Sequence, residues 1–293
     1  MRIMHVIKAI ATLLALGAVI GTAHLMKEYT GTVRDMPAAL MEEQREVELA
    51  LKLKAEQGSQ SGNEPGEKAF QRARELLAMK SMDEAEVKLK YIVSYYPAAE
   101  AATEARRILG EINVDRLLDP DWREGKRVVV VKRGDTFTRI IRNNQTTMDS
   151  IIHLSKLMRA DHRSLHPGDK LTVMPLDMRV VINLRRKTLT IWRQGEFIKE
   201  YPIQKIAYNG RATVRPLKVG SILGAAGGKM YPSHHEAYRS ARKVIFLSDK
   251  SLAIRAFSAD NADDMQLGFF LTSADMEELP LLLRRGNDVE IRN

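Results

Sequence analysis

The first feature that bears on chemistry is the absence of cysteine from the 293 residues. Without a thiol the chain has no cysteine nucleophile, no disulfide framework and no thiolate zinc site. Serine, histidine and glutamate come together at Ser233-His234-His235-Glu236. Because adjacent side chains of an extended segment point to opposite sides, we expect a solvated loop there, with no catalytic residue and no metal ligand.

Motifs that hold common cofactors are also missing from the sequence. It contains no H-E-x-x-H pair, no Gly-rich phosphate loop and no nucleophile elbow. The glycine-rich run Gly224–Gly228 is interpreted as a lone flexible turn and not as a nucleotide site. We therefore expect no cofactor.

The charge is distributed unevenly along the chain. Residues 1–122 hold 16 Lys/Arg and 19 Asp/Glu, a balance of −3, whereas residues 123–293 hold 30 and 18, a balance of +12. The basic part favours an anionic partner such as a wall polymer, a membrane surface or a nucleic acid. The length and the ordinary globular composition, 44% hydrophobic and 28% charged, predict two or three small domains.

An apolar segment at the N-terminus predicts a membrane anchor within residues 1–30. Arg2 and Lys8 precede the uncharged stretch Ala9–Met26, whose 18 residues would span about 27 Å as a helix. The two cations place the remainder outside the cytoplasm, facing the periplasm or cell wall, which argues against a nucleic-acid partner. The alternative is a cleaved signal peptide, with Gly21-Thr22-Ala23 as the cleavage site.

Helical patterns follow the N-terminal segment. Residues 31–66 predict a helical stalk that ends in a polar Gly/Ser/Pro linker. Within 67–118, a first helix is expected to end near Met79. A second starts after Ser81, with Ser81 and Glu84 as a capping box, and ends at Pro97 before a third helix.

The arrangement of these helices resembles a tetratricopeptide repeat. The positions that carry the resemblance are Ala73, Leu77, Ala85, Tyr95 and Pro97, and they cover about one and a half repeats. A plain helical hairpin is the alternative.

Residues 126–176 predict the order strand, helix, helix, strand. The run Val128–Val131 forms the first strand, and Gly134 permits a tight turn after it. Asp135 or Thr136 can cap the first helix, and Thr147 can cap the second. A turn containing Gly168 leads to the last strand.

This segment resembles a LysM domain. The resemblance rests on Val131–Phe137 (VKRGDTF) and Pro167–Val173 (PGDKLTV). It implies binding of N-acetylglucosamine-containing polymers, chiefly peptidoglycan, in a groove between two loops. The implied glycan-binding residues are Gly134, Asp135, Thr136, Phe137, Met158, Arg159, Ala160 and Asp161. The alternative is a spacer of LysM shape without a ligand.

Residues 179–203 alternate between apolar and polar side chains, and further strands are expected at Val244–Leu247 and Leu252–Ala256. Residues 179–293 are therefore predicted to form a domain made mostly of strands. Hairpin turns are expected around Arg186 and Gly195, and another strand at Tyr201–Gln204. A helix capped by Ser273 precedes a closing strand at 289–291.

The pattern resembles the catalytic domain of L,D-transpeptidases, both in its opening strands and in the closing Arg285–Ile291. That family carries the signature S/H-x-G-C-x-R, in which the cysteine attacks a peptide carbonyl with a histidine as its base. Here the matching stretch reads Gln266–Leu271, with Phe269 at the nucleophile position and Leu271 at the arginine position. The histidine position maps to Ile254-Arg255-Ala256, so the resemblance implies a domain that has lost its catalytic residues.

Together these patterns predict a multidomain α+β chain. Its parts are a membrane helix, a helical hairpin region, a βααβ LysM module and a mostly-β, L,D-transpeptidase-like domain at 179–293. The first functional hypothesis is a membrane-tethered peptidoglycan-binding protein without catalytic activity. The second is a scaffold for cell-wall machinery that recruits envelope proteins through residues 67–113. The third, a working L,D-transpeptidase, is opposed by the missing cysteine.

Overall fold

The computed structural model describes residues 64–157, 165–208, 210, 216–249, 251–257 and 267–293. The predicted membrane segment and most of the stalk lie outside these residues. So do Met158, Arg159, Ala160 and Asp161 of the predicted glycan groove. Among the residues described, no helix has both the length and the apolar character needed to cross a bilayer.

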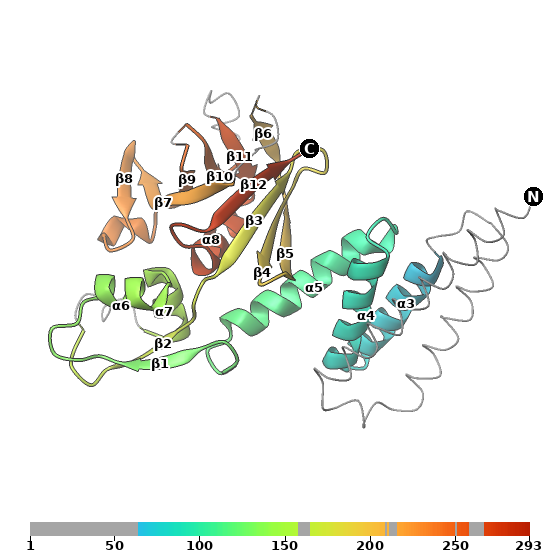
Figure 1. The fold of residues 1–293 in the computed structure, drawn as a ribbon, viewed down its shortest axis with the longest axis horizontal. Coiled ribbons are helices and arrows are strands. Elements are labelled where there is room, and N and C mark those ends of the chain that lie inside the picture. The colour runs from blue at the N-terminus through green and yellow to red at the C-terminus, as the bar shows by residue number, and fades with distance from the viewer. Residues whose placement is uncertain (1–63, 158–164, 209, 211–215, 250, 258–266) are drawn as a thin grey trace, which may run out of the picture. The chain divides into compact units, whose positions relative to one another are not determined.

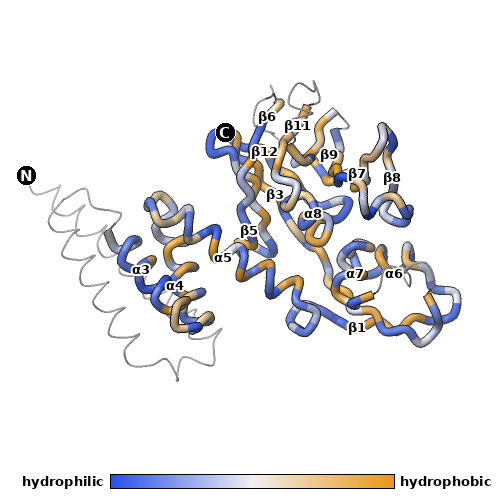
Figure 2. The backbone as a smooth tube through the Cα atoms, turned by 180° about the vertical axis from the view of Figure 1, so that it is seen from behind, coloured by the Kyte–Doolittle hydropathy of each residue, from blue (hydrophilic) through white to orange (hydrophobic). Residues whose placement is uncertain are grey.

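Three helices open the described part, as expected: α3 (Glu64–Ala78), α4 (Met82–Tyr95) and α5 (Ala101–Leu118). Small and branched apolar side chains fill the space between them. The buried members include Ala73, Ala85, Leu89, Ile92, Ala105 and Leu109. Hydrophobic and hydrophilic residues follow one another along α5 (Figure 2). Its buried residues lie on one face of the helix: Ala101, Ala102, Ala105, Arg106, Leu109, Gly110 and Val114.

The predicted capping box at the start of α4 is wrong. The side chain of Ser81 makes no capping hydrogen bond. Instead the backbone N–H of Ser81 donates to the carbonyl of Leu76 (2.8 Å), and that of Lys80 donates to Leu77 (3.0 Å). With Lys80 at φ +61°, these bonds form the Schellman ending of α3, so the preceding helix fixes the backbone of Ser81.

The next module has the predicted order of strand, helix, helix and strand: β1 (Arg127–Val130), α6 (Phe137–Asn144), α7 (Met148–Leu154) and β2 (Lys170–Val173). The two strands pair antiparallel, with Val129 opposite Leu171. The hydroxyl of Thr136 accepts from the N–H of Arg139 (3.2 Å), and that of Thr147 accepts from Ser150 (3.1 Å). Both threonines therefore cap their helices as the sequence predicts.

The C-terminal part is built on one curled sheet. Its elements are β3 (Met178–Asn183), β4 (Thr188–Arg193), β5 (Glu196–Pro202), β6 (Lys205–Ala207), β7 (Leu217–Ala226), β8 (Lys229–Pro232), η3 (Glu236–Tyr238), β9 (Arg242–Leu247), β10 (Ala253–Ala256), β11 (Gly268–Leu271), α8 (Ser273–Leu282) and β12 (Asp288–Arg292). The strand order is β5-β4-β3-β12-β7-β9-β10-β11-β6, with β8 paired to β7. The last strand thus enters between β3 and β7, beside which it lies in Figure 1.

Two details of this part differ from the sequence-based expectations. Tyr201 and Pro202 are the last residues of β5 and do not start a separate strand, because the chain turns before β6. Within the glycine-rich run, Gly224 lies in β7, and Gly227 and Gly228 form the turn to β8 with φ of +56° and +73°. The run is therefore a strand end and a hairpin turn.

The cap of α8 is also different from the prediction. Thr272, not Ser273, is the N-cap, because its hydroxyl accepts from the N–H of Asp275 (3.1 Å). The Asp275 carboxylate in turn accepts from the N–H of Thr272 (3.3 Å), which completes a reciprocal capping box.

Helix α5 packs directly on β5 (Figure 1). Gly110 makes this approach possible, since a Cβ there would lie 2.9 Å from Cγ of Lys199. The side-chain amide of Asn113 donates to the carbonyls of Phe197 (2.9 Å) and Ile198 (3.1 Å), which lie on the outermost strand of the sheet. The helix therefore covers a sheet edge that would otherwise offer unpaired backbone groups.

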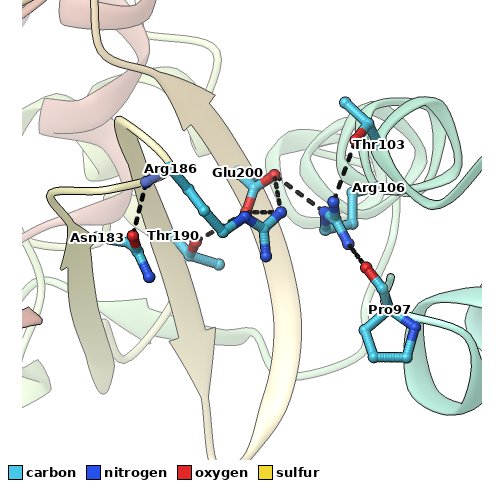
Figure 3. A network of polar contacts seen from close by, with 7 residues as sticks. All are labelled: Pro97, Thr103, Arg106, Asn183, Arg186, Thr190 and Glu200. Atoms are coloured by element: carbon cyan, nitrogen blue, oxygen red, sulfur yellow. Dashed lines mark hydrogen bonds and ion pairs between the residues drawn. The ribbon is translucent and has the colours of Figure 1, made fainter. Parts of the chain in front are cut away.

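A buried charged network fastens α5 to the sheet (Figure 3). The Arg106 guanidinium contacts the Glu200 carboxylate at 2.9 Å, and their side chains are only 7% and 12% exposed. Arg106 also donates to the carbonyl of Pro97 (3.3 Å) and to the hydroxyl of Thr103 (3.3 Å). Arg186 approaches the same carboxylate from the sheet side at 3.4 Å.

A second buried cation joins three elements. The Lys199 ammonium on β5 contacts Glu111 of α5 and Glu278 of α8, each at 3.0 Å. Burial alone would lower the pKa of Lys199, but the hydrogen bonds to the two glutamates outweigh it and raise the pKa. The ammonium thus stays charged and ties α5, β5 and α8 together.

We predict that Arg106→Ala destabilises the protein by about 3 kcal/mol, because it leaves the buried Glu200 carboxylate without its main partner. The matched control is Arg107→Ala on the exposed side of α5. Arg107 is 60% exposed and pairs with the exposed Glu104, so its loss should cost less than about 1 kcal/mol. Urea unfolding followed by tryptophan fluorescence measures both; equal losses would contradict the account.

Candidate functional site

The first loop of the predicted glycan groove, residues 134–137, is open to solvent. Gly134 and Thr136 are exposed, while Asp135 and Phe137 are half-buried. Gly134 has φ +85°, and no atom lies within 4 Å of a Cβ built there. Space is therefore available over this turn, and its backbone conformation is one that favours glycine.

Hydrogen bonds hold this loop in shape. The Asp135 carboxylate accepts from the N–H of Lys132 (2.8 Å). The Arg139 guanidinium donates to the carbonyl of Gly134 (3.3 Å), and Thr136 caps α6. The loop is thus fixed by its own residues before any ligand arrives.

The second loop of the groove lies outside the described residues, but its entry from α7 is visible. The Ser155 hydroxyl accepts from the N–H of Thr172 (2.9 Å), which ties the end of α7 to β2. Lys156 has φ +52° and its ammonium contacts Asp121 at 3.0 Å. The structure therefore positions the start of this wall but not Met158 through Asp161.

The βααβ module also packs on the sheet domain through a polar cluster that no pattern in the sequence predicts. The Tyr238 hydroxyl donates to the Asp149 carboxylate (3.1 Å). The hydroxyl of Thr147 donates to the carbonyl of Pro280 in α8 (3.0 Å). Lys243, 4% exposed as a side chain, contacts Glu277 at 3.2 Å beside this cluster.

This packing changes the acidity of Asp149. Burial raises the pKa of its carboxyl to about 6, against the opposing effects of the Tyr238 hydroxyl and the Lys243 ammonium. Burial and the neighbouring carboxylate also raise the pKa of Tyr238, so the phenol stays protonated and remains the donor. The cluster therefore titrates at mildly acidic pH.

Hydrophobic core residues occupy the position that the sequence resemblance assigns to a nucleophile. Phe269 and Leu271 on β11 are both 0% exposed. The Phe269 ring lies 5.7 Å from that of Tyr208, and Phe269 pairs with Ile254 on the parallel strand β10. A Cβ on Gly268 would lie 1.9 Å from the carbonyl oxygen of Ala253, so the two strands approach closely there. These side chains pack and offer no group that can attack a carbonyl.

Two cations lie near this position. The Lys205 ammonium and the Arg255 guanidinium lie 5.6 Å and 5.8 Å from the centre of the Phe270 ring. Arg255 occupies the predicted histidine position, and a guanidinium does not lose its proton in a protein. It therefore cannot serve as a base.

The Ser233–Glu236 cluster forms a turn, as predicted. His234, His235 and Glu236 are exposed, and His235 accepts from the N–H of Ala237 (3.1 Å) to cap η3. Within the described parts of the chain, no group of three His, Cys, Asp or Glu side chains is arranged to hold a metal ion.

Part of this module matches a known domain family. Residues 129–173 match the LysM domain family. The match lies inside the predicted module and includes the exposed loop 134–137. The LysM domain accounts for a minor part of the chain, and a comparison with curated protein sequences found no match.

The C-terminal part is similar in structure to L,D-transpeptidases. Each comparison covers 43% of this chain. L,D-transpeptidase 1 of Mycobacterium tuberculosis is 10% identical, with a TM-score of 0.30 and 69% of its chain covered. An L,D-transpeptidase of Mycobacterium smegmatis is 9% identical, with a TM-score of 0.28 and 64% covered. A cysteine-to-serine mutant of the Enterococcus faecium enzyme is 14% identical, with a TM-score of 0.27 and 53% covered.

The chain thus spans less than two thirds of the last two proteins. At such low identities and TM-scores these similarities carry no conclusion about activity. The chemistry of this chain has to be argued from its own residues.

We predict that Asp149→Asn makes stability less dependent on pH. The folded pKa of about 6 lies above the unfolded value of 3.8, so the folded protein keeps its proton between these pH values while the unfolded chain loses it. Stability from this group is therefore present below pH 3.8 and lost as pH rises through 6, by about 3 kcal/mol. Asparagine can still accept from Tyr238 and does not titrate.

Urea unfolding of both proteins between pH 4 and pH 7 measures this effect. The stability of Asp149→Asn relative to the unsubstituted protein should rise across that range. A difference that is the same at both ends would show that Asp149 is not buried as described.

Proposed function

We propose that this protein binds peptidoglycan through its LysM domain and does no chemistry on it. The observation that carries the proposal is the LysM match at 129–173, with the loop at Gly134–Phe137 exposed and held in shape. LysM domains bind the glycan chains of peptidoglycan. In this proposal Gly134, Asp135, Thr136 and Phe137 form one wall of the groove, and residues 158–161 form the other.

The absence of catalysis is supported by residues, not by the comparisons. The chain has no cysteine anywhere in its 293 residues. Phe269 is packed in the core at the position where the sequence resemblance would place the nucleophile, and Arg255 stands at the position of the base. A buried phenyl ring and a permanently charged guanidinium cannot form an acyl-enzyme.

Charge and the N-terminal sequence support the rest of the proposal. The balance of +12 over residues 123–293 would draw this part toward anionic components of the wall. The apolar run at 9–26, preceded by two cations, supports a single-pass anchor in the cytoplasmic membrane with the other domains outside the cytoplasm.

Scaffolding is a second candidate, because α4 and the turn before it expose apolar side chains. Met79, Met82, Val87 and Tyr95 are 61%, 44%, 50% and 69% exposed. Exposed apolar side chains can contribute to protein-binding surfaces. If an envelope protein binds there, binding to the wall would serve to position that protein at the peptidoglycan.

Sedimentation with purified sacculi tests the main proposal. The purified protein should pellet with sacculi, and salt should weaken its binding, because the Debye length shortens from about 10 Å at 0.1 M to about 3 Å at 1 M. Protein that stays in the supernatant at low salt would contradict the proposal.

A pair of glycine variants locates the binding. Gly134→Ala should reduce sacculus affinity severalfold, because alanine is strained at φ +85° and the exposed loop must shift. Gly168→Ala is the matched control, since Gly168 has φ +100° with equally open surroundings but lies outside the groove. Both should lose about 1 kcal/mol of stability. Equal affinity in the two variants would place the binding elsewhere.

One substitution separates the two candidate functions. Val87→Glu puts a charge on the exposed face of α4. A point substitution is preferable to deleting the helical region, because loss of α5 would expose β5. A scaffold would lose its cellular function with this change while still pelleting with sacculi. If wall binding is the function, Val87→Glu should behave like the unsubstituted protein, whereas Gly134→Ala should not.

A further inference from the structure

A cleft of about 700 Å³ opens between α4, α5 and the β4–β5 hairpin, and its lining does not include Gly134–Phe137 of the first LysM loop. Its volume lies within the range of about 300–1,000 Å³ that is usual for small-molecule sites. Both tryptophans of the chain, Trp122 and Trp192, line it, together with Phe197. Trp192, Gly195 and Ile198 of the lining lie in the strands that resemble L,D-transpeptidases, whereas the LysM motifs at 131–137 and 167–173 do not contribute to it.

The aromatic rings are held by neighbours but remain accessible. The rings of Trp192 and Phe197 meet edge to face, 5.8 Å apart. The Arg116 guanidinium lies 4.9 Å from the centre of the Trp122 ring, and Trp122 is 39% exposed. Such fixed aromatic surfaces can contact a ligand at little entropic cost.

Ion pairs order the polar wall. The Glu86 carboxylate contacts both Arg116 and Lys90 at 2.7 Å, and its side chain is only 8% exposed. Burial alone would raise the pKa of Glu86, but the hydrogen bonds from Lys90 and Arg116 hold it below its ordinary value. The cleft thus presents charged hydrogen-bonding groups in set positions beside the aromatic rings.

The charges that line the cleft cancel. Three acidic side chains face three basic ones: Glu86, Glu124 and Glu196 against Lys90, Arg116 and Arg193. The cleft therefore does not share the basic balance of +12 that residues 123–293 carry. This favours an uncharged ligand with many hydrogen-bonding groups over an anionic polymer.

A pyranose ring fits this combination. Its hydroxyl and acetamido groups accept and donate hydrogen bonds, while its C–H faces are apolar and can lie against aromatic rings. An extended peptide would meet a wall whose backbone carbonyls at Phe197 and Ile198 are already taken by the Asn113 amide.

We propose that this cleft is a second carbohydrate site, which binds a short N-acetylhexosamine segment between Trp122 and Trp192. The choice of this sugar rests on the proposed function, whereas the inference of a sugar site rests on the cleft itself. Two sites on one chain would let it hold a glycan strand by avidity.

Intrinsic fluorescence tests the proposal, because residues 126–176 contain no tryptophan and the LysM domain is silent in this measurement. Titration of the purified protein with an N-acetylglucosamine tetrasaccharide should change the tryptophan emission saturably. The change should persist in Gly134→Ala. No change, or a change lost in Gly134→Ala, would overturn the second site.

Substitutions confirm the location. Trp122→Ala should weaken the fluorescence-detected affinity at least fivefold, with Trp192 as the remaining reporter. Trp122→Phe keeps an aromatic face and should stay within about threefold of the unsubstituted protein. Tyr95→Ala is the control, since Tyr95 is 69% exposed on α4 and does not line the cleft. Equal affinity in Trp122→Ala and Tyr95→Ala would overturn the proposal.

The possible outcomes distinguish the proposed LysM function from the proposed second carbohydrate site. Calorimetric sugar binding that Gly134→Ala abolishes, with no change in fluorescence, would leave the LysM function standing and refute the second site. A saturable fluorescence change with a sugar-free peptide, and none with the tetrasaccharide, would make the cleft a peptide site and refute the sugar proposal.

Discussion

The packing of α5 on β5 is the constraint on which the other features depend. Gly110 lets the helix approach the outermost strand, and the buried Arg106–Glu200 pair and the Lys199–Glu111 pair hold it there. The same contact forms one wall of the aromatic cleft, which is the cleft lined by Trp122, Trp192 and Phe197. Because a buried ion pair is costly to break from one side, this contact fixes the helices as part of the sheet domain. The helices are therefore not a separate repeat unit that could be removed without exposing the sheet.

The core beside β10 and β11 is filled by apolar side chains. Gly268 allows β11 to approach β10 closely, while Phe269 and Leu271 fill the core beside it. Burial of such side chains contributes about 2 kcal/mol or more each, so these residues stabilise the sheet. What remains exposed and ordered is the LysM loop at 134–137 and the aromatic cleft, both of which suit binding.

Much of the LysM domain could be predicted from sequence because its determinants are local. Thr136 and Thr147 cap helices that start one residue later, and Gly134 forms a turn by its own backbone. Ser81 and Ser273 are not the capping residues that the sequence predicts, because other local hydrogen bonds form instead. The Schellman ending of α3 fixes the backbone of Ser81, and Thr272 takes the capping position before Ser273. The Asp149–Tyr238 and Arg106–Glu200 contacts join residues 89 and 94 positions apart, and no periodicity reports such pairs.

The central claim is binding without chemistry, and one incubation tests it most directly. Purified protein is mixed with sacculi, and the pellet is analysed both for bound protein and for its muropeptide composition. We expect the protein in the pellet and a muropeptide profile identical to that of sacculi incubated alone. New cross-links or released fragments that depend on the protein would contradict the account.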